Sequence, residues 1–210
     1  MLARWQARSC VGQVMQLDIP PGPFAGYIFD LDGTLIDSMP VHYRAWDAAM
    51  HQFGLNQPLD PDFFYSMGGV PTVRVAELIA QHYGLTVEPM EVFHIKERLF
   101  VEMLGHVQHI EPTVAFLKRV AASTPCAVAS GGPRDVVNHS LRLAGLGGYF
   151  RAIVTADDVV HGKPSPDMFL LAASIMHVPA AQCLVFEDAE PGMRGARAAG
   201  MQVVHVPSRR

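Results

Sequence analysis

Two aspartates separated by one residue raise the first chemical question in this 210-residue sequence. Asp30 and Asp32 follow the short apolar run 27–29, and like charges this close repel each other and are costly to remove from water. Other polar side chains follow further apolar runs: Ser130, Lys163 and the pair Glu187–Asp188. If these groups meet, only cations can hold the carboxylates together, and Lys163 with a divalent metal ion would supply the charge.

A site built of carboxylate oxygens favours Mg²⁺, which prefers an octahedral shell at about 2.0–2.1 Å and retains several waters. Alternate residues of an extended segment project to the same side, so Asp30 and Asp32 can act on one substrate. One carboxylate can attack a phosphoryl group, once cations have neutralised both, while the other transfers protons. Gly33 and Thr34 let the chain turn away at once. The pattern therefore predicts a phosphoryl-transfer site.

An alternation of short apolar runs with longer helical segments must position these side chains. Five runs are typical of buried parallel strands: 27–29, 126–129, 152–155, 183–186 and 203–206. The helical segments open on proline and several end at glycine. We therefore predict an α/β fold with a doubly wound parallel sheet. Because the carboxyl ends of parallel strands converge on one rim, the polar groups should share one small volume.

The region 40–106 breaks the alternation, because it contains amphipathic helical stretches and no convincing strand. We predict that it is a small all-helical cap domain, inserted after the first strand and lying over the sheet edge where open α/β folds bind ligands. The catalytic core would then consist of 23–39 and 107–210. A cluster of prolines separates the core from residues 1–22, which we interpret as a loosely attached N-terminal extension.

Composition narrows the range of partners. A formal net charge of −4 and a pI near 6.2 give no electrostatic footprint for nucleic acid or an anionic membrane surface. No apolar stretch approaches the roughly 18 residues of a membrane span, and the first residues lack the organisation of a signal peptide. Cys10, Cys126 and Cys183 have no metal-binding spacing, which favours free thiols and a reducing compartment. We expect a cytoplasmic monomer or weak homodimer.

Four motifs, taken together and in order, resemble those of the haloacid dehalogenase-like hydrolases. They are "DLDGTL", "VASGG", "GKPSPD" and "FEDAEPGMRGARAAGM", and the resemblance covers residues 24–206. The sequence is most similar to the subfamily with a small helical cap after the first motif. That subfamily includes β-phosphoglucomutase and sugar-phosphate phosphatases of the fructose-1-phosphatase type. The resemblance implies a Rossmann-like core and a small phosphorylated metabolite, such as a sugar phosphate, as the substrate.

The resemblance also implies roles for the core motifs. Asp30 would be the nucleophile that forms an aspartyl-phosphate, and Asp32 the general acid and base. Ser130 and the backbone amide of Gly131 would bind the transferring phosphoryl group, whose charge Lys163 would neutralise.

The metal site follows from the same motifs. Mg²⁺ would be held by Asp30, by the backbone carbonyl of Asp32 and by Asp188, with Glu187 in or next to the shell.

The predicted cap offers a second set of residues, for substrate binding. His42 resembles a substrate-proximal histidine of the subfamily, although it could equally cap a helix. Gly69, Thr72 and Arg74 lie in a "GxPTxR" pattern that resembles the fructose-1-phosphatase type. Thr72 stands where the mutases have an arginine that clamps a second phosphate, and residues two apart on a helix do not share a face, so Arg74 need not replace it.

This difference favours a phosphatase, with a phosphomutase resembling β-phosphoglucomutase as the alternative. A haloacid dehalogenase is disfavoured, because those relatives lack the second aspartate that is present here as Asp32. A catalytically idle protein that only binds a phosphorylated ligand is a third hypothesis, against which the intact acidic motifs argue.

Overall fold

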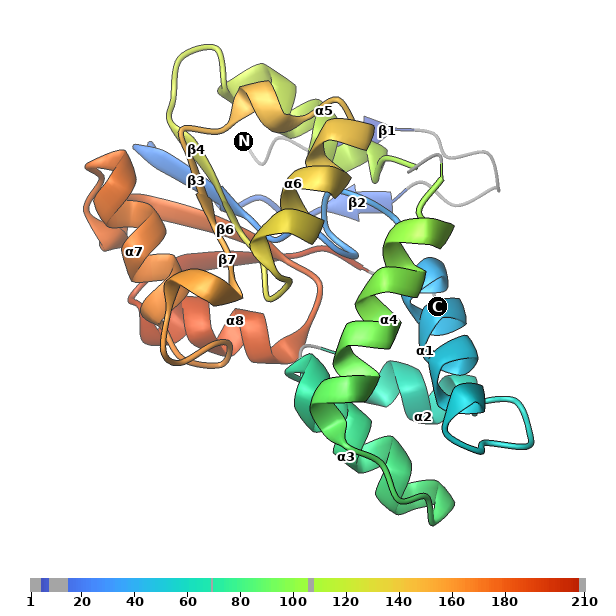
Figure 1. Ribbon diagram of the computed structural model, residues 1–210. Helices are drawn as coiled ribbons and strands as arrows, with labels where there is room; N and C mark the ends of the chain where they lie inside the picture. Colours follow the sequence, from blue (N-terminus) through green and yellow to red (C-terminus); the bar gives the residue numbers. More distant parts are fainter. Residues whose placement is uncertain (1–4, 8–14, 69, 106–107, 208–210) are drawn as a thin grey trace.

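The computed structural model describes residues 5–7, 15–68, 70–105 and 108–207. Its main feature is a sheet of five parallel strands in the order β5-β4-β3-β6-β7 (Figure 1). The strands are β3 (Gly26–Phe29), β4 (Cys126–Ala129), β5 (Ala152–Val154), β6 (Cys183–Glu187) and β7 (Gln202–His205). The five predicted strands and the doubly wound parallel sheet are therefore confirmed, and the core is Rossmann-like.

The strand order reverses between β3 and β6, which places the two acidic motifs side by side. The chain runs from β3 outward to β4 and β5, and then returns to the other side of β3 to form β6 and β7. Phe29 is in register with Phe186, and the amide of Asp30 donates to the carbonyl of Phe186 at 3.0 Å. Asp30 and Glu187 thus emerge at the same level, at the point where sheets of this kind bind ligands.

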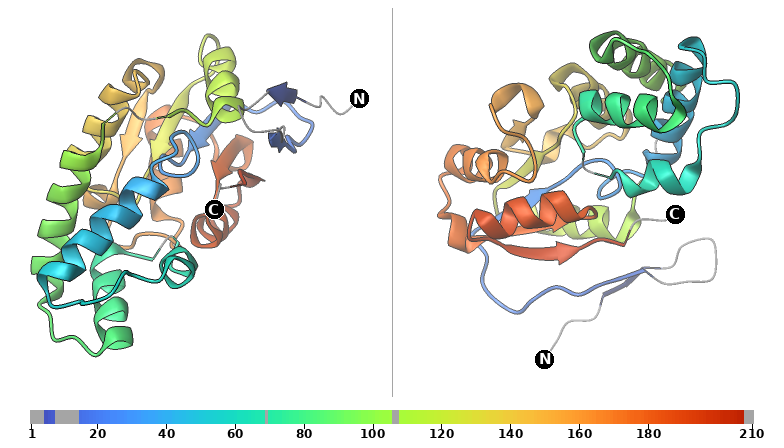
Figure 2. Two further views of the ribbon diagram at one scale, coloured as in Figure 1. Left: turned by 90° about the vertical axis from the view of Figure 1, so that its right-hand side faces the viewer. Right: turned by 90° about the horizontal axis from the view of Figure 1, so that it is seen from below.

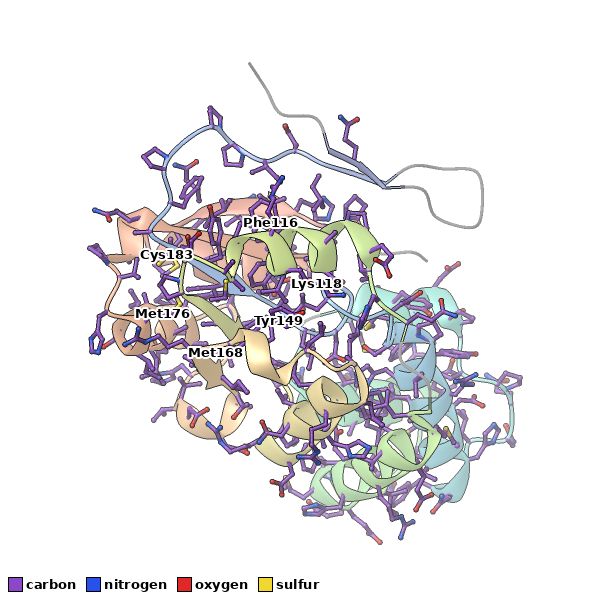
Figure 3. The ribbon with its side chains drawn as sticks, turned by 90° about the horizontal axis from the view of Figure 1, so that it is seen from above. Phe116, Lys118, Tyr149, Met168, Met176 and Cys183 are labelled. Atoms are coloured by element: carbon purple, nitrogen blue, oxygen red, sulfur yellow. The ribbon has the colours of Figure 1, made fainter. Side chains whose placement is uncertain are left out.

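Helices cover both faces of the sheet, each over its own apolar cluster. They are α5 (Glu111–Val120), α6 (Arg134–Leu143), α7 (Asp167–Met176) and α8 (Glu190–Ala198). Phe116 of α5 belongs to the cluster on one face, whereas Met168 and Met176 of α7 belong to the other (Figure 3). The inner strands β4 and β6 are buried along their whole length, which explains why they appear in the sequence as continuous apolar runs.

Four helices form an insertion between β3 and α5, at one end of the sheet (Figures 1 and 2). They are α1 (Met39–Gln52), α2 (Pro61–Ser66), α3 (Thr72–Tyr83) and α4 (Pro89–Met103). The insertion has its own apolar cluster, which includes Trp46, Met50 and Ile79. Its two ends meet where the backbone amide of Asp37 donates to the carbonyl of Gln108 at 2.9 Å. The short helix α2 was not predicted, because six residues are too few to show a helical period.

The segment before the sheet is more firmly attached than the sequence suggested. Strands β1 (Trp5–Ala7) and β2 (Met15–Leu17) form an antiparallel pair. Leu17 is only 3% exposed and belongs to the same apolar cluster as Phe29. The extension therefore packs on the core through Leu17, whose place there depends on contacts distant in sequence.

Two further expectations can be compared with the described residues. Cys126 and Cys183 are buried free thiols, as predicted, whereas Cys10 lies outside the described part of the chain. Among the helices that the structure describes, none combines the length and the apolar character needed to traverse a lipid bilayer.

Candidate active site

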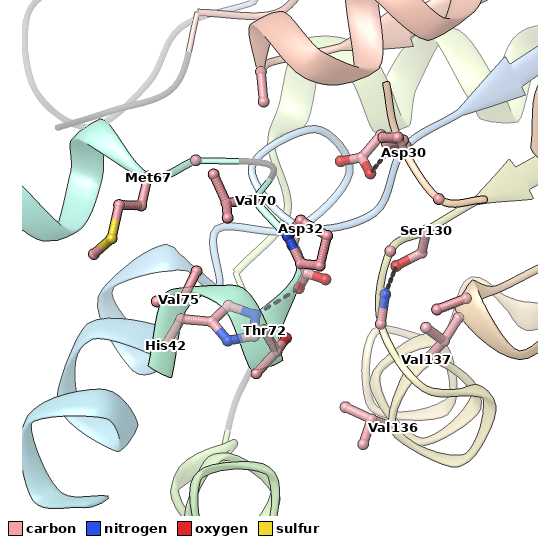
Figure 4. Close-up of a pocket in the computed structure, with 18 of the residues that line it drawn as sticks. Asp30, Asp32, His42, Met67, Val70, Thr72, Val75, Ser130, Val136 and Val137 are labelled. Carbon is pink, nitrogen blue, oxygen red and sulfur yellow. Dashed lines mark hydrogen bonds and ion pairs between the residues drawn. The ribbon is translucent and has the colours of Figure 1, made fainter. Parts of the chain in front are cut away.

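A cavity of about 440 Å³ lies between the carboxyl edge of the sheet and the helical insertion. All the predicted core residues line it: Asp30, Asp32, Ser130, Gly131, Lys163, Glu187 and Asp188. In Figure 4, His42, Thr72 and Val75 from the insertion lie on one side of Asp32, and Ser130 and Val137 lie on the other. The structure thus brings together residues that are up to 158 positions apart (188 − 30) in the chain.

Lys163 holds two carboxylates at the bottom of this cavity. Its Nζ atom donates to Oδ1 of Asp30 and to Oε1 of Glu187, both at 2.6 Å. Burial would lower the pKa of Lys163, but the two carboxylates outweigh burial and raise it, so that the side chain is a cation. Burial also raises the pKa of Asp30 to about 7, against the opposing effect of Lys163.

Asp188 adds a third carboxylate to this group. Oxygen atoms of Asp30, Glu187 and Asp188 lie within 4.8 Å of one another. Burial, followed by the negative charges of Asp30 and Glu187, raises the pKa of Asp188 to about 9. One lysine cannot compensate three carboxylates, of which Asp30 and Glu187 are buried, and this excess of negative oxygen ligands fits a hard divalent cation such as Mg²⁺.

Glu187 is less suited to bind the cation directly than Asp30 and Asp188. Its Oε1 atom accepts from Lys163, and its Oε2 atom accepts from the amide of Ala189 at 2.8 Å. Both carboxylate oxygens are therefore engaged in holding Lys163 and the start of α8. This arrangement favours a place for Glu187 next to the metal shell.

Two glycines allow the acidic side chains to approach the backbone. Gly33 has φ +85°, and a Cβ atom there would lie 2.3 Å from Oδ2 of Asp188. A Cβ atom on Gly192 would lie 1.6 Å from Oε1 of Glu187. The turn at Gly33 was predicted, whereas the contact at Gly192 depends on how α8 packs and carries no signal in the sequence.

Asp32 is held by two residues at the entrance to the insertion. Its Oδ1 atom accepts from Oγ of Ser38 at 2.5 Å and lies 3.4 Å from Nε2 of His42 (Figure 4). Burial would raise the pKa of Asp32, but the hydrogen bonds from His42 and Ser38 outweigh burial and lower it. In the absence of substrate, Asp32 is therefore an ionised carboxylate that can accept a proton.

The other ring nitrogen of His42 contacts a buried lysine of α4. Nζ of Lys96 lies 2.9 Å from Nδ1 of His42, and the His42 ring stacks on Phe100 with centroids 3.9 Å apart. Burial and the positive charge of Lys96 lower the pKa of His42. Because an ammonium group can only donate, Nδ1 must accept, and the proton of neutral His42 then lies on Nε2, facing Asp32.

Glu97, the neighbour of Lys96, completes this group. Nζ of Lys96 donates to Oε1 of Glu97 at 2.8 Å, and both residues line the cavity. Neither Glu97 nor Ser38 was among the site residues predicted from the sequence. Lys96 lies four residues from both Val92 and Phe100, on the buried face of α4. A charged residue on the apolar face of a helix is visible in the sequence and indicates a functional role. Glu97 lacks this spacing relative to Val92 and Phe100, so its place at the cavity has no such signal in the sequence.

Ser130 is placed at the end of β4, where a phosphoryl group could bind. It is only 1% exposed, and its Oγ atom accepts from the amide of Gly132 at 3.2 Å. Its own amide donates to Val154 of the neighbouring strand at 2.9 Å. The hydroxyl is thereby fixed at the cavity wall beside Gly131.

The predicted substrate-binding residues of the insertion divide into three cases. His42 and Thr72 line the cavity. Arg74 does not: it is on the exposed face of α3, where it pairs with Glu77 at 2.5 Å. Two residues along a helix turn the side chain to the opposite face, so the expectation that Arg74 contacts substrate is not supported. Gly69 lies outside the described residues.

Comparisons with known proteins are consistent with this geometry. The family model for haloacid dehalogenase-like hydrolases matches residues 24–200. Fructose-1-phosphate phosphatase YqaB of Escherichia coli is 38% identical, over 87% of this chain and 96% of its own length. Hexitol phosphatase A of the same organism is 31% identical, over 86% and 82%. A crystal structure of a putative β-phosphoglucomutase from Thermotoga maritima has a TM-score of 0.64 and 26% identity, over 85% of this chain and 83% of its own.

Proposed function

Because the chain belongs to the haloacid dehalogenase-like hydrolases and is a phosphoric monoester hydrolase, we propose that it cleaves a small sugar phosphate with Mg²⁺ and through an aspartyl-phosphate on Asp30. One observation carries the proposal. Lys163 bridges Asp30 and Glu187 at 2.6 Å, with an oxygen of Asp188 inside the same group of carboxylates. A structural ion pair needs one carboxylate for each lysine, whereas this site has an excess of carboxylates that suits a metal cation, which could in turn bind a phosphate.

In the first step, a carboxylate oxygen of Asp30 attacks phosphorus, and the bond from phosphorus to the ester oxygen breaks. Asp32 gives a proton to the departing alkoxide, having taken that proton up when the negatively charged phosphate enters beside it. Lys163 and Ser130 hold the equatorial oxygens of the phosphoryl group. Bound Mg²⁺, held by Asp30, Asp188 and the Asp32 carbonyl, would neutralise charge on the transferring group.

In the second step, Asp32 accepts a proton from water, which attacks phosphorus and releases phosphate from Asp30. His42 keeps its Nε2 proton directed at the Asp32 carboxylate, so the same oxygen is presented in both steps. Both steps conserve atoms and charge with only substrate and water as reactants.

The helical insertion supports the assignment of residues 40–106 as a cap. It covers the cavity with Thr72, Val75 and Lys96, and its two ends meet beside Asp32. Movement about these ends would admit substrate and exclude bulk water during transfer. The core would then be formed by 23–39 and 107–210, as the sequence suggested. Its buried free thiols, Cys126 and Cys183, fit a reducing compartment such as the cytoplasm.

A phosphomutase is the second candidate, and the structure gives it less support. A mutase must bind a second phosphate, which needs an available cation on the cap side of the cavity. Among the described lining residues, Lys96 and Lys163 are the two lysines, and each is bound to a carboxylate. Arg74 is outside the cavity. Conversion of glucose 1-phosphate to glucose 6-phosphate, activated by a sugar bisphosphate, would favour the mutase.

A panel of phosphorylated compounds tests the proposal. The panel contains fructose 1-phosphate, sorbitol 6-phosphate, glucose 6-phosphate, 6-phosphogluconate, a nucleoside monophosphate and p-nitrophenyl phosphate, each assayed with Mg²⁺ and with EDTA. We expect Mg²⁺-dependent phosphate release from a sugar or polyol phosphate. Absence of release from every compound would contradict the proposal.

A further inference from the structure

One oxygen of Glu97 is buried at the cavity without a hydrogen-bond donor among the described residues. Glu97 is 8% exposed, and its Oε1 atom accepts from Lys96 at 2.8 Å. Its Oε2 atom is shielded from bulk water and has no hydrogen-bond partner in the described part of the chain. A desolvated carboxylate oxygen without a donor costs free energy, and such groups in folded proteins require an explanation. Since Glu97 lines the cavity, a small rotation of its carboxylate would present this oxygen to a bound ligand, which can supply the missing donor.

The position of Glu97 indicates which part of the ligand it would contact. Phosphate would occupy the bottom of the cavity, at Asp30 and Lys163, where the strands end. Glu97 comes from α4 of the insertion, whose residues line the cavity on the side away from the sheet. A group that contacts Glu97 therefore belongs to the alcohol that leaves, and not to the phosphoryl group that is transferred.

The charges on the insertion side indicate the chemistry of that alcohol. The ammonium group of Lys96 is already shared between Glu97 and His42. The rest of this wall is largely apolar, with Met67, Val70 and Val75 among its residues. A second phosphate or a carboxylate on the alcohol would meet the Glu97 charge without a free cation to balance it. A neutral hydroxyl would instead donate to the unsatisfied oxygen.

We propose that Glu97 determines substrate specificity, because its Oε2 atom accepts a hydrogen bond from a hydroxyl of the leaving alcohol. This contact selects phosphate esters whose alcohol is uncharged and carries several hydroxyl groups, and the charge of Glu97 rejects bisphosphates. This inference rests on the proposed phosphatase activity and adds the class of leaving group to it. Selection of this kind combines an attractive contact for the correct ligand with a repulsive one for the wrong ligand.

The test compares three substrates in the wild type and in Glu97→Gln. The first is the neutral sugar or polyol phosphate that the wild type cleaves fastest in the panel above. The second is fructose 1,6-bisphosphate, and the third is p-nitrophenyl phosphate, whose leaving group has no alcohol hydroxyl. Glutamine can still accept from Lys96, but it places an uncharged amide where Oε2 was. Hydrogen bonds to charged groups have a larger effect than neutral ones.

We expect kcat/KM for the neutral sugar phosphate to fall about 10- to 100-fold relative to p-nitrophenyl phosphate in Glu97→Gln. The preference for that substrate over the bisphosphate should shrink by at least about 10-fold. Glu97→Asp, which keeps the charge but withdraws it by one methylene, should show the same fall for the neutral sugar phosphate, whereas its kcat/KM for the bisphosphate relative to p-nitrophenyl phosphate should stay at the wild-type value. Glu97→Asp also serves as the test variant if Glu97→Gln does not fold. Glu102→Gln, on the exposed face of the same helix, is the matched control and should change none of the ratios.

Equal losses on all three substrates in both Glu97 variants would overturn the inference, since they would mean that Glu97 only supports Lys96 and the fold. Unchanged ratios would overturn it as well. If the wild type cleaves none of the three, the proposed function fails and the inference fails with it. If the wild type cleaves p-nitrophenyl phosphate and the Glu97 variants keep the wild-type ratios, the proposed phosphatase activity stands and only the role of Glu97 is refuted.

Discussion

Lys96 lies 2.9 Å from His42 although 54 residues separate them in the chain, and this contact joins the last helix of the insertion to the first. Through His42 the contact extends to Asp32, 3.4 Å away on the other side of the ring. A cation on the insertion thereby fixes the tautomer of a histidine that faces the proposed acid and base. The insertion therefore does more than line the cavity, because it also orients a group of the proposed reaction centre.

Replacing Lys96 should destabilise the fold and impair Asp32 together. Lys96→Met would leave Glu97 as a buried, unpaired carboxylate, and breaking a buried ion pair costs about 3–5 kcal/mol. We expect a decrease of that size in the free energy of unfolding, measured with urea. The double variant Lys96→Met/Glu97→Gln should recover part of the loss, because the uncompensated charge is gone. Arg98→Met, on the exposed face of the same helix, should stay within about 0.5 kcal/mol of the wild type.

Asp30→Asn should abolish turnover and leave the fold intact. Asparagine is nearly the same size, but it cannot attack phosphorus to form a stable phosphoenzyme. The change also removes one of the negative charges that raise the pKa of Asp188, so without metal the variant should be at least as stable as the wild type. Phosphate release and thermal unfolding in EDTA measure the two effects. Retained turnover would exclude Asp30 as the nucleophile.

That most of the core residues of the candidate site would meet at one cavity could be predicted from the sequence for a physical reason. Asp30, Ser130 and Glu187 each end or follow a strand that is buried on both sides, and buried parallel strands appear as continuous apolar runs. Strands of one parallel sheet release their next residues at one edge. A charged or hydroxyl side chain immediately after such a run is therefore located in space by topology alone.

The insertion could not be predicted to the same level. Whether Arg74 or Thr72 faces the cavity depends on the rotation of α3, and two residues along a helix reverse the direction of a side chain. The role of Ser38 depends on a turn that brings it back to Asp32, and that of Glu97 on how α4 packs against α1. These arrangements are set by tertiary contacts and not by local pattern, as is the burial of Leu17.

Metal removal should have a pH dependence that follows from two carboxyl groups. Without metal, the pKa of Asp30 is raised to about 7 and that of Asp188 to about 9, against about 4 in an unfolded chain. Between those values the folded protein holds protons that the unfolded chain has released. The stability of the metal-free protein should therefore fall as pH rises from about 4 towards 9.

Mg²⁺ bound at the proposed site would compete with those protons, so its stabilising effect should change in the opposite direction. The increase in Tm on replacing EDTA by Mg²⁺ should be larger at about pH 8.5 than at about pH 6. Asp188→Asn should remove most of this increase at either pH. An equal increase at both pH values in the wild type would show that the ion binds elsewhere.

Gly192 should be intolerant of even the smallest side chain, although it neither titrates nor contacts substrate. A Cβ atom there would lie 1.6 Å from Oε1 of Glu187, the atom that accepts from Lys163. Gly192→Ala must therefore displace Glu187 or the start of α8, and either shift releases Lys163 from its place beside Asp30. We expect a loss of at least about 10-fold in kcat, because phosphoryl transfer depends on the position of charge, and a decrease of about 1–3 kcal/mol in the free energy of unfolding. Gly148→Ala is the matched control, since a Cβ atom at that position has no neighbour within 4 Å, and it should leave both quantities unchanged. If Gly192→Ala retained the kcat of the wild type, the hold of Glu187 on Lys163 would not matter for the reaction.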